Sequence, residues 1–408
     1  MRAIRHFQIF VKLAFAAMVL SGLNAAVAQA QYSITDLGTL GGDNSIPYWI
    51  TNTGDVIGMS DTGQFDSFGN PIDHAFRWSK GVMHDLGTMG DINSVGNGGN
   101  DAGAAVGNNW YNLNHALLWY KGSVADLGTL VGPGGYSWVQ QINSKGQIVG
   151  GSEAADATFH AVLWNHGMIS DLGTLGAPGS SLFSAAQDIN DLGQVIGESQ
   201  EDNVVNPLLG FAAFFPTLWN RGVATKLAGE PSYSVGGDGF AINNKSQVVG
   251  RLAVPDPTEG LIAHAYFWEA GAMQDLGIPN GLGDDNSQAN SLNDNGQVVG
   301  ASGVGFIESY APNHALLWQN GVWSDLNTLV PPNSGYHLIV AFDVNARGEI
   351  VVCAVNVNTG NVHAALLSPQ PSNVIPGNAG NSHQSAPLLS ANAQRLITLV
   401  QSRRHFKH

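Results

Sequence analysis

The chain has 408 residues, a formal net charge of −15, 12% charged residues and 52 glycines. This length allows two or three domains or one repeat array, and the composition favours short strands and many turns. The acidic balance excludes sequence-independent binding to nucleic acid and disfavours anionic membrane surfaces, because both need clustered Lys and Arg. The single cysteine, Cys353, excludes an internal disulfide and a Cys-based metal site.

Residues 1–30 have the pattern of a secretory signal peptide. Arg2, Arg5 and Lys12 precede a short apolar core, Leu13–Leu23, and Ala28–Ala30 offers a small-residue cleavage site. The alternative is a membrane anchor, but spanning a bilayer needs about 18–20 apolar residues and this run is shorter. No later segment is long enough to span either. We therefore expect a secreted or periplasmic mature protein with a net charge of about −18 and no transmembrane segment.

From Asp36 onward, related sequence motifs recur at intervals of about 41–55 residues, which indicates a solenoid, a propeller or an array. The first motif is an apolar residue, often Asn, two further residues, Gly, a β-branched pair and usually Gly. Asn and Gly tolerate the positive φ of tight turns and Val and Ile favour strands, so each copy predicts strand, turn, strand. The copies are Ile50–Gly58, Gly99–Gly107, Ile142–Gly150, Ile189–Gly197, Ile242–Gly250, Leu292–Gly300 and Val344–Val352.

The second motif is His-Ala, two apolar residues and Trp, and it predicts a strand that is mostly apolar on both faces. We expect each His to bridge backbone groups of a neighbouring strand, and each Trp to pack between repeats. Equivalent strands of a ring are spread apart, so these histidines cannot share one metal ion. The copies are His74–Trp78, His115–Trp119, His160–Trp164, His264–Trp268 and His314–Trp318, with Phe215–Trp219 and His363–Leu367 as variants.

The third motif is Asp-Leu-Gly at the end of a short strand. We expect its carboxylate to accept backbone N–H groups of the turn that follows. The copies begin at Asp36, Asp85, Asp126, Asp171, Asp275 and Asp325, and Lys226–Ala228 is the weakest version.

A further short strand precedes each first motif, as in Ser137–Ile142 and Ser184–Ile189, so each repeat holds four antiparallel strands, the content of one propeller blade. Seven copies predict an all-β fold, a seven-bladed β-propeller over residues 31–370. No Asp-Leu-Gly follows His363–Leu367, and the missing strand stands at Tyr32–Gly38. We expect this N-terminal strand to pair into the last blade, since closure removes exposed edges. A linear solenoid would have capping repeats instead.

Residues 371–408 lie outside the repeats. Pro371–Pro387 is rich in Pro, Asn, Gly and Ser, which predicts a flexible linker. Leu388–Val400 has the pattern of a short amphipathic helix, and a basic cluster follows it at Arg403, Arg404 and Lys407.

The combination of Asp-Leu-Gly-Thr-Leu-Gly, Ile-Asn-x-x-Gly-Gln-Val-Val-Gly and His-Ala-Phe/Leu-Leu-Trp resembles the HAF family of probable bacterial extracellular repeats, over roughly residues 32–368. This resemblance implies an exported β protein built from repeats, and it supplies no catalytic residues. Many members resemble surface-sorted proteins with a C-terminal Pro-Glu-Pro signal, an apolar anchor and a basic end. This chain has only the basic end of that set.

The connections between the second and third strands vary most, and binding residues tend to lie on such loops. Aromatic rings mixed with Asn and carboxylates suit a glycan, a peptide or a partner protein, while the alternative is solvated loops with incidental aromatics. The candidate binding residues are Phe65, Asp66, Trp110, Tyr111, Glu201, Asp202, Asp256, Glu259, Glu308 and Tyr310.

The loops after the third motif share Asp, Asn and Ser, at Gly42–Ser45, Gly90–Ser94 and Gly283–Ser287. Such oxygen ligands suit Ca²⁺, but no loop has EF-hand spacing and the same residues favour turns. We therefore expect no metal and no other cofactor.

Gly-x-Ser-x-Gly, His-Glu-x-x-His and phosphate-binding motifs are absent from the sequence. The favoured hypothesis is a monomeric, secreted binding or structural module with a glycan, peptide or protein ligand on its rim. The alternative is a polysaccharide hydrolase or lyase with carboxylates at the channel mouth, such as Glu201 with Asp256. A third option is an acidic scaffold without a small ligand. An enzyme should show carboxylates that converge in a pocket with perturbed pKa values.

Overall fold

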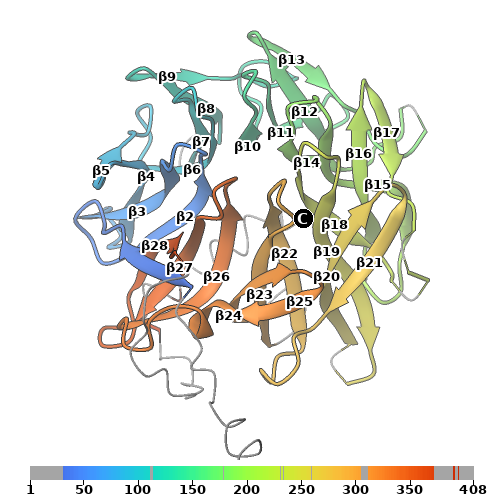
Figure 1. Ribbon diagram of the computed structural model, residues 1–408. Helices are drawn as coiled ribbons and strands as arrows, with labels where there is room; N and C mark the ends of the chain where they lie inside the picture. The colour runs from blue at the N-terminus through green and yellow to red at the C-terminus, as the bar shows by residue number, and fades with distance from the viewer. Residues whose placement is uncertain are drawn as a thin grey trace, which may run out of the picture.

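The computed structural model describes residues 31–110, 114–177, 179–229, 231–232, 234–258, 260–304, 311–371, 389–390 and 394. Seven four-stranded sheets stand around a central axis in this part of the chain (Figure 1). This arrangement confirms the predicted seven-bladed β-propeller. The expected signal peptide at 1–30 and nearly all of the tail at 372–408 lie outside the described residues. Within the described ranges, no helix combines the length and apolar character that crossing a bilayer requires.

Each blade has an inner strand beside the channel and three strands that follow outward, and blades are numbered 1–7 from β2 onward (Figure 1). The inner strands are β2 (Ser45–Ile50), β6 (Asn93–Gly99), β10 (Ser137–Ile142), β14 (Ser184–Ile189), β18 (Gly237–Ile242), β22 (Asn286–Leu292) and β26 (Tyr336–Val344). The second strands are β3 (Val56–Phe65), β7 (Ala105–Trp110), β11 (Ile148–Glu153), β15 (Val195–Val205), β19 (Val248–Asp256), β23 (Val298–Val304) and β27 (Ile350–Asn356).

The two remaining strands of each blade lie farther from the axis (Figure 1). The third strands are β4 (Pro71–Ser79), β8 (Ala116–Tyr120), β12 (Phe159–Asn165), β16 (Ala212–Asn220), β20 (Gly260–Glu269), β24 (Ala311–Gln319) and β28 (Val362–Pro369). The outer strands are β5 (Val82–Asp85), β9 (Ser123–Asp126), β13 (Met168–Asp171), β17 (Val223–Lys226), β21 (Ala272–Gly277), β25 (Val322–Asp325) and, in blade 7, β1 (Tyr32–Asp36). A short 3-10 turn, η1 (Leu326–Thr328), follows β25.

The first motif forms the hairpin between the inner and second strands, as predicted. In blade 3 the glycine of this turn, Gly146, has a φ of 76°. The motif's Asn does not use its tolerance of a positive φ, because Asn143 is not among the described residues that adopt one. Its side-chain Oδ1 instead accepts the N–H groups of Lys145 and Gln147, each at 3.0 Å. Asn stands here because its side chain closes the turn.

The same Asn also links the blades to each other. In blades 2 to 7 the Nδ2 group of this residue donates to the backbone carbonyl at the equivalent position of the next blade. The six links run Asn100 to Asn143, Asn143 to Asn190, Asn190 to Asn243, Asn243 to Asn293, Asn293 to Asn345 and Asn345 to Thr51, at 2.9–3.2 Å. Only the step from Thr51 to Asn100 lacks this bond, since Thr has no amide.

Every inner strand contains a shift in register that the sequence motifs did not predict. Three residues before the motif's Asn or Thr, the register with the second strand shifts, as at a β-bulge that leaves one residue unpaired. In β10 the shift falls between Val139 and Gln141, so Gln140 is the extra residue. The extra residues in the seven blades are Tyr48, Asn97, Gln140, Gln187, Phe240, Asn290 and Phe342.

The bulge explains the glycine that ends the first motif. Opposite the bulge, a Cβ atom on Gly150 would lie 2.0 Å from the carbonyl oxygen of Trp138. Blades 1, 2, 4, 5 and 6 show the same approach, at 1.8–2.1 Å. Blade 7 has Val352 at this position, and its inner strand carries a second register shift, between Leu338 and Val340. The sixfold glycine is therefore a requirement of the bulged inner strand.

Gly150→Ala is expected to lower the free energy of unfolding by about 3 kcal/mol, because the new methyl group overpacks a fixed backbone carbonyl. Gly146→Ala is the matched control: a Cβ there meets no atom within 4 Å, so only the left-handed backbone costs about 1 kcal/mol. Urea unfolding of both variants tests this difference. Equal losses would show that the bulge does not constrain Gly150.

The histidines of the second motif contact carboxylates, a partner that the expectation of bridged backbone groups did not include. The ring Nδ1 atom lies 2.6–2.9 Å from the Asp of the third motif, because the two motifs stand side by side on the third and outer strands. The pairs are His74–Asp85, His115–Asp126, His160–Asp171, His264–Asp275 and His363–Asp36, while His314 pairs with Asp284. The expected turn contact is confirmed, since the other oxygen of Asp171 accepts the N–H of Gly173 at 2.7 Å.

Blade 7 combines both ends of the described propeller. β1 pairs with β28 along its whole length, beside β27 and β26. His363 of β28 and the hydroxyl of Tyr336 both contact Asp36 Oδ2, at 2.7 and 2.5 Å. The Leu37 N–H donates to the carbonyl of Ala364 at 2.9 Å. In blade 7, Asp36 of the N-terminal strand β1 thus makes the contact with His363 that an Asp of the same repeat makes in most other blades.

The core lies between neighbouring blades. Trp219 of blade 4 is 1% exposed and packs with Val149 and Ala161 of blade 3. The other motif tryptophans lie in separate clusters of the same kind, as predicted: Trp78, Trp119, Trp164, Trp268 and Trp318. Cys353 is buried within β27, also as predicted.

Candidate functional site

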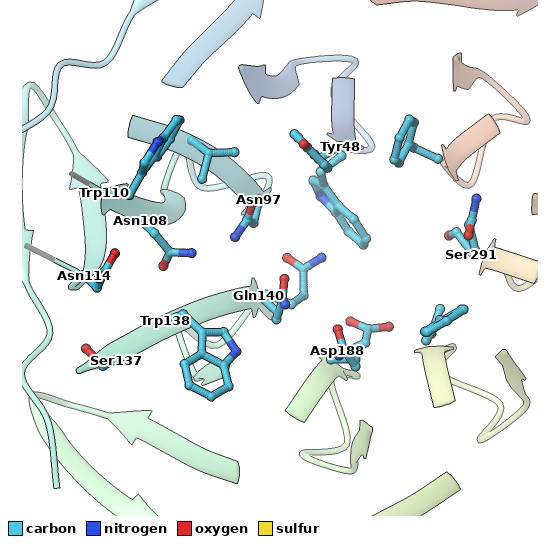
Figure 2. Close-up of a pocket in the computed structure, with 18 of the residues that line it drawn as sticks. Tyr48, Asn97, Asn108, Trp110, Asn114, Ser137, Trp138, Gln140, Asp188 and Ser291 are labelled. Atoms are coloured by element: carbon cyan, nitrogen blue, oxygen red, sulfur yellow. The ribbon is translucent and has the colours of Figure 1, made fainter. Parts of the chain in front are cut away.

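The central channel opens into a cavity of about 470 Å³, to which every blade contributes (Figure 2). It lies toward the face that carries the hairpins between second and third strands, which we call the loop face. The opposite face carries the inner–second and third–outer turns and is called the turn face. All seven bulge residues line the cavity: Tyr48, Asn97, Gln140, Gln187, Phe240, Asn290 and Phe342. The bulge therefore turns one side chain of each inner strand into the channel.

These seven residues form a ring with a simple chemistry. Three are aromatic and four are side-chain amides, and none carries a formal charge. An amide both donates and accepts hydrogen bonds, and an aromatic ring offers an apolar face. A cavity lined by aromatic side chains with a few converging polar groups is the usual form of a small-molecule site.

Blades 2 and 3 supply one wall of the cavity, with Trp110, Trp138 and Phe159 (Figure 2). The rings of Trp138 and Phe159 lie 5.2 Å apart between centroids at 55°. Trp138 is only 6% exposed, so packing fixes its indole. Trp110 stands at the end of β7, where the chain leaves the sheet toward the loop face. This wall gives a bound molecule a rigid apolar surface.

Two amides of the cavity are held by one backbone segment. Asn97 Nδ2 donates to the carbonyl of Val139 at 2.7 Å, and Asn108 Oδ1 accepts the Val139 N–H at 2.8 Å. Within the described residues, these bonds fix the orientation of both amides and leave the other end of each without a hydrogen bond. Preorganised polar groups of this kind reduce the ordering cost of binding.

Asp188 is the one carboxylate among the described lining residues. Its two oxygens accept the N–H groups of Ile189 and, in the next blade, Ile242, both at 2.8 Å. Burial raises the pKa of Asp188 to about 7 despite these N–H groups. Asp343 is the equivalent residue of blade 7, and burial raises its pKa to about 6. Around neutral pH Asp188 is therefore only partly ionised, and it adds less negative charge to the cavity than an ordinary carboxylate would.

A second carboxylate cluster adjoins the cavity between blades 4 and 5. Gln187 Nε2 lies 3.3 Å from both oxygens of Glu198. Nearby, the Arg251 Nε–H donates to Asp238 Oδ2 at 2.6 Å, and Arg251 is 4% exposed. Burial and the neighbouring Asp238 raise the pKa of Glu198 well above its usual value. Glu198 thus holds a proton more readily than an ordinary carboxyl, next to the ring residue Gln187.

The rim residues named from the sequence are distributed differently. Trp110 lines the cavity, whereas Phe65 is 62% exposed on the β3–β4 hairpin and outside the cavity. Asp66 and Asp202 accept N–H groups within their own turns, and so does Asp256. Glu201 contacts Lys226, with Oε2 to Nζ at 3.6 Å, rather than Asp256. The remaining candidates, Tyr111, Glu259, Glu308 and Tyr310, lie outside the described residues.

Sequence reasoning missed the ring because it followed variable loops instead of the inner strands. A usable signal existed, since each ring residue stands three positions before the first motif's Asn or Thr. The spacing from Gln140 to Asn143 is the same as from Gln187 to Asn190. The position is therefore constant from repeat to repeat, while the residue that occupies it varies.

The loops considered for calcium use their oxygens within the protein. Asn44 bonds the Asp61 carboxylate and accepts the Val362 N–H. Asp284 contacts Ser302, Asn313 and His314. In the described ranges no three His, Cys, Asp or Glu side chains are grouped to hold a metal ion.

No protein-family model and no curated protein matches the chain. Among solved structures, the β-propeller domain of the Trilobed protease from Pyrococcus furiosus is 8% identical with a TM-score of 0.46, covering 76% of this chain and 89% of that one. A gluconolactonase from Xanthomonas campestris is 11% identical with a TM-score of 0.36, covering 85% and 93%. The Aleuria aurantia lectin, as a mutant with Fucalpha1-6GlcNAc, is 12% identical with a TM-score of 0.35, covering 73% and 95%. This likeness concerns the propeller fold alone.

Proposed function

We propose that the protein is an exported binding module that holds a neutral oligosaccharide in the central cavity. The observation that carries this proposal is the ring of seven bulge residues, all aromatic or amide, that faces one cavity of about 470 Å³. The volume falls within the range of small-molecule sites. We therefore propose the central cavity, instead of the rim loops, as the place where the ligand binds.

The chemistry of the lining matches a sugar ring. Each hydroxyl of a sugar donates and accepts a hydrogen bond, and side-chain amides such as Asn97 and Gln140 do both. The C–H face of a sugar is apolar and suits the aromatic surfaces of Tyr48 and Trp110. Asp188 accepts a backbone N–H at each oxygen and its pKa is raised to about 7, so it is a weaker partner for a cationic ligand than an ordinary carboxylate. A neutral, hydroxyl-rich molecule fits this set better than a charged one.

Export is part of the proposal and rests on the sequence. Residues 1–30 have the charge, apolar core and cleavage pattern of a signal peptide. The resemblance to HAF repeats, proposed over roughly residues 32–368, agrees with an extracytoplasmic protein. Polysaccharides are available to such a protein as ligands.

Trp110→Ala and Gln140→Ala are each expected to weaken oligosaccharide binding at least tenfold, or about 1.4 kcal/mol. The first removes an apolar surface and the second a donor–acceptor pair from the ring. A glycan array identifies the oligosaccharide, and isothermal titration calorimetry measures the change. Phe65→Ala is the control, because its side chain lies on an exposed hairpin outside the cavity. No binding to any neutral glycan, or equal losses in the control, would contradict the proposal.

A hydrolase is the second candidate, and Glu198 favours it. A carboxyl with a raised pKa is the form that a general acid needs, and Asp238 stands nearby as a second carboxylate. The ion pair with Arg251 occupies Asp238, which argues for a structural role. Incubation of the wild type and Glu198→Gln with the bound oligosaccharide separates the two functions. Products released by the wild type alone would establish hydrolysis, and intact oligosaccharide in both establishes binding.

A further inference from the structure

A second cavity, of about 420 Å³, lies on the turn face between blades 3 and 4, away from the mouth of the central cavity. Four turns border it, and they come from both blades. They are the β10–β11, β12–β13, β14–β15 and β16–β17 turns, which include Lys145, His166, Leu192 and Arg221 respectively. Neighbouring blades thus build this cleft together.

Three basic side chains line the cleft, and none of its lining residues is a carboxylate. Lys145, His166 and Arg221 are exposed, and within the described residues their side chains form no hydrogen bond or ion pair. Asp191 lies in a bordering turn, but its oxygens accept the Ser144 N–H and the Asn244 amide. The chain has 31 Asp and Glu against 16 Lys and Arg, so an unopposed basic group is unusual here.

The counterparts of Lys145 in blades 5 and 7 are neutralised or engaged. Lys245 is the blade 5 counterpart of Lys145, and its Nζ donates to the Asp294 carbonyl at 2.6 Å. The blade 7 counterpart, Arg347, pairs with Glu349. Where blade 7 has Glu349, blade 3 has Gln147.

At the end of the third strand, blade 3 again has an amide where another blade has a carboxylate. Blade 5 has Glu269 there, and this carboxylate accepts a hydrogen bond from Gln247 at 2.8 Å. Blade 3 has Asn165 at the corresponding position, which lines the cleft. Blade 3 therefore lacks the carboxylate that blade 7 places beside its basic turn residue and the one that ends the third strand of blade 5.

The floor of the cleft is apolar. Leu163 and Leu172 are half-buried beneath it, and Leu192 is 63% exposed at its edge. Gln147 and Asn165 add amide groups between the floor and the cations. We propose that this cleft binds a small organic oxyanion, whose carboxylate or sulfate contacts the three basic side chains and whose body packs on the leucines. This site is separate from the cavity proposed for neutral oligosaccharides.

Calorimetry with glucuronate, glucose and inorganic sulfate tests the proposal. Glucuronate is expected to bind in the cleft, and sulfate to bind there more weakly than glucuronate. Any binding of glucose takes place in the central cavity and should be unchanged by the double variant Lys145→Gln with Arg221→Gln. This double variant should weaken glucuronate binding at least tenfold. Raising the salt concentration should weaken it too, because exposed charges are screened. The variant should keep the affinity of the central cavity for its neutral oligosaccharide.

Lys80→Gln with Lys121→Gln is the matched control, because these residues occupy the equivalent outer turns of blades 1 and 2 and remove the same charge. The control should bind glucuronate as the wild type does. An equal loss of glucuronate affinity in the control would show that the loss comes from the change in net charge, and it would overturn the proposed site. Leu192→Ser should weaken glucuronate but not sulfate, and no effect on glucuronate would overturn the role of the apolar floor. Melting curves of each variant verify that it folds.

Discussion

Removal of Gln31–Gly38 is expected to convert the propeller into an aggregating protein with a lower melting temperature. The deletion takes away β1, which supplies the outer strand of blade 7. It exposes the backbone edge of β28, and an unpaired edge of this kind recruits other chains. It also removes Tyr32 and Leu37, which are 4% and 5% exposed, at about 2 kcal/mol of lost burial each.

Size-exclusion chromatography and thermal unfolding of the truncated chain measure this effect. Asp36→Ala serves as a graded control, since it keeps the strand and removes the contacts to His363 and Tyr336 and the turn bond from the Gly38 N–H. Burial by itself raises the pKa of Asp36, but these two side chains lower it to about 2. The control should stay monomeric with a smaller loss of stability. A truncated protein that remains monomeric with an unchanged melting temperature would contradict the role of β1.

Arg251→Gln is expected to lower the free energy of unfolding by about 3–5 kcal/mol at neutral pH, because it leaves a buried carboxylate without its cation. Arg251 is 4% exposed and holds Asp238 at 2.6 Å, beside Glu198. Arg347→Gln is the control, since its pair with Glu349 is exposed and is worth about 0–1 kcal/mol. Urea unfolding of both variants provides the comparison, and losses of equal size would contradict a special role for the buried pair.

The loss in Arg251→Gln should depend on pH with a defined sign. Burial and Asp238 raise the folded-state pKa of Glu198 above its unfolded value of 4.5, and Arg251 opposes this. A group with a raised folded pKa stabilises the protein at low pH and loses that contribution as pH rises through the folded pKa. The variant should therefore lose more stability relative to wild type at pH 8 than at pH 5.

The repeats allowed the architecture to be predicted because local patterns determine it. Turn glycines such as Gly146, and the strand that the motif around Trp164 indicates, follow from residue type and spacing alone. The number of strands per blade then follows from the alternation of turns and apolar runs. Even the bounds Ser137–Ile142 of an inner strand agree with the structure.

The cavity was harder to predict because a bulge has no local sequence requirement on its own strand. Gln140 faces the channel only because the partner residue, Gly150, lets the inner backbone approach. That dependence joins two strands, and the sequence shows only the glycine. The His–Asp contacts were missed for a similar reason, since His160 and Asp171 become neighbours through strand pairing.

A crystal structure of the protein with the tightest-binding oligosaccharide of the array tests the central claim most directly. We predict a sugar in the central cavity, in contact with at least one bulge residue such as Gln140 or Tyr48 and with Trp110. A sugar bound only on the exposed hairpin at Phe65, or elsewhere on the rim, would contradict the account.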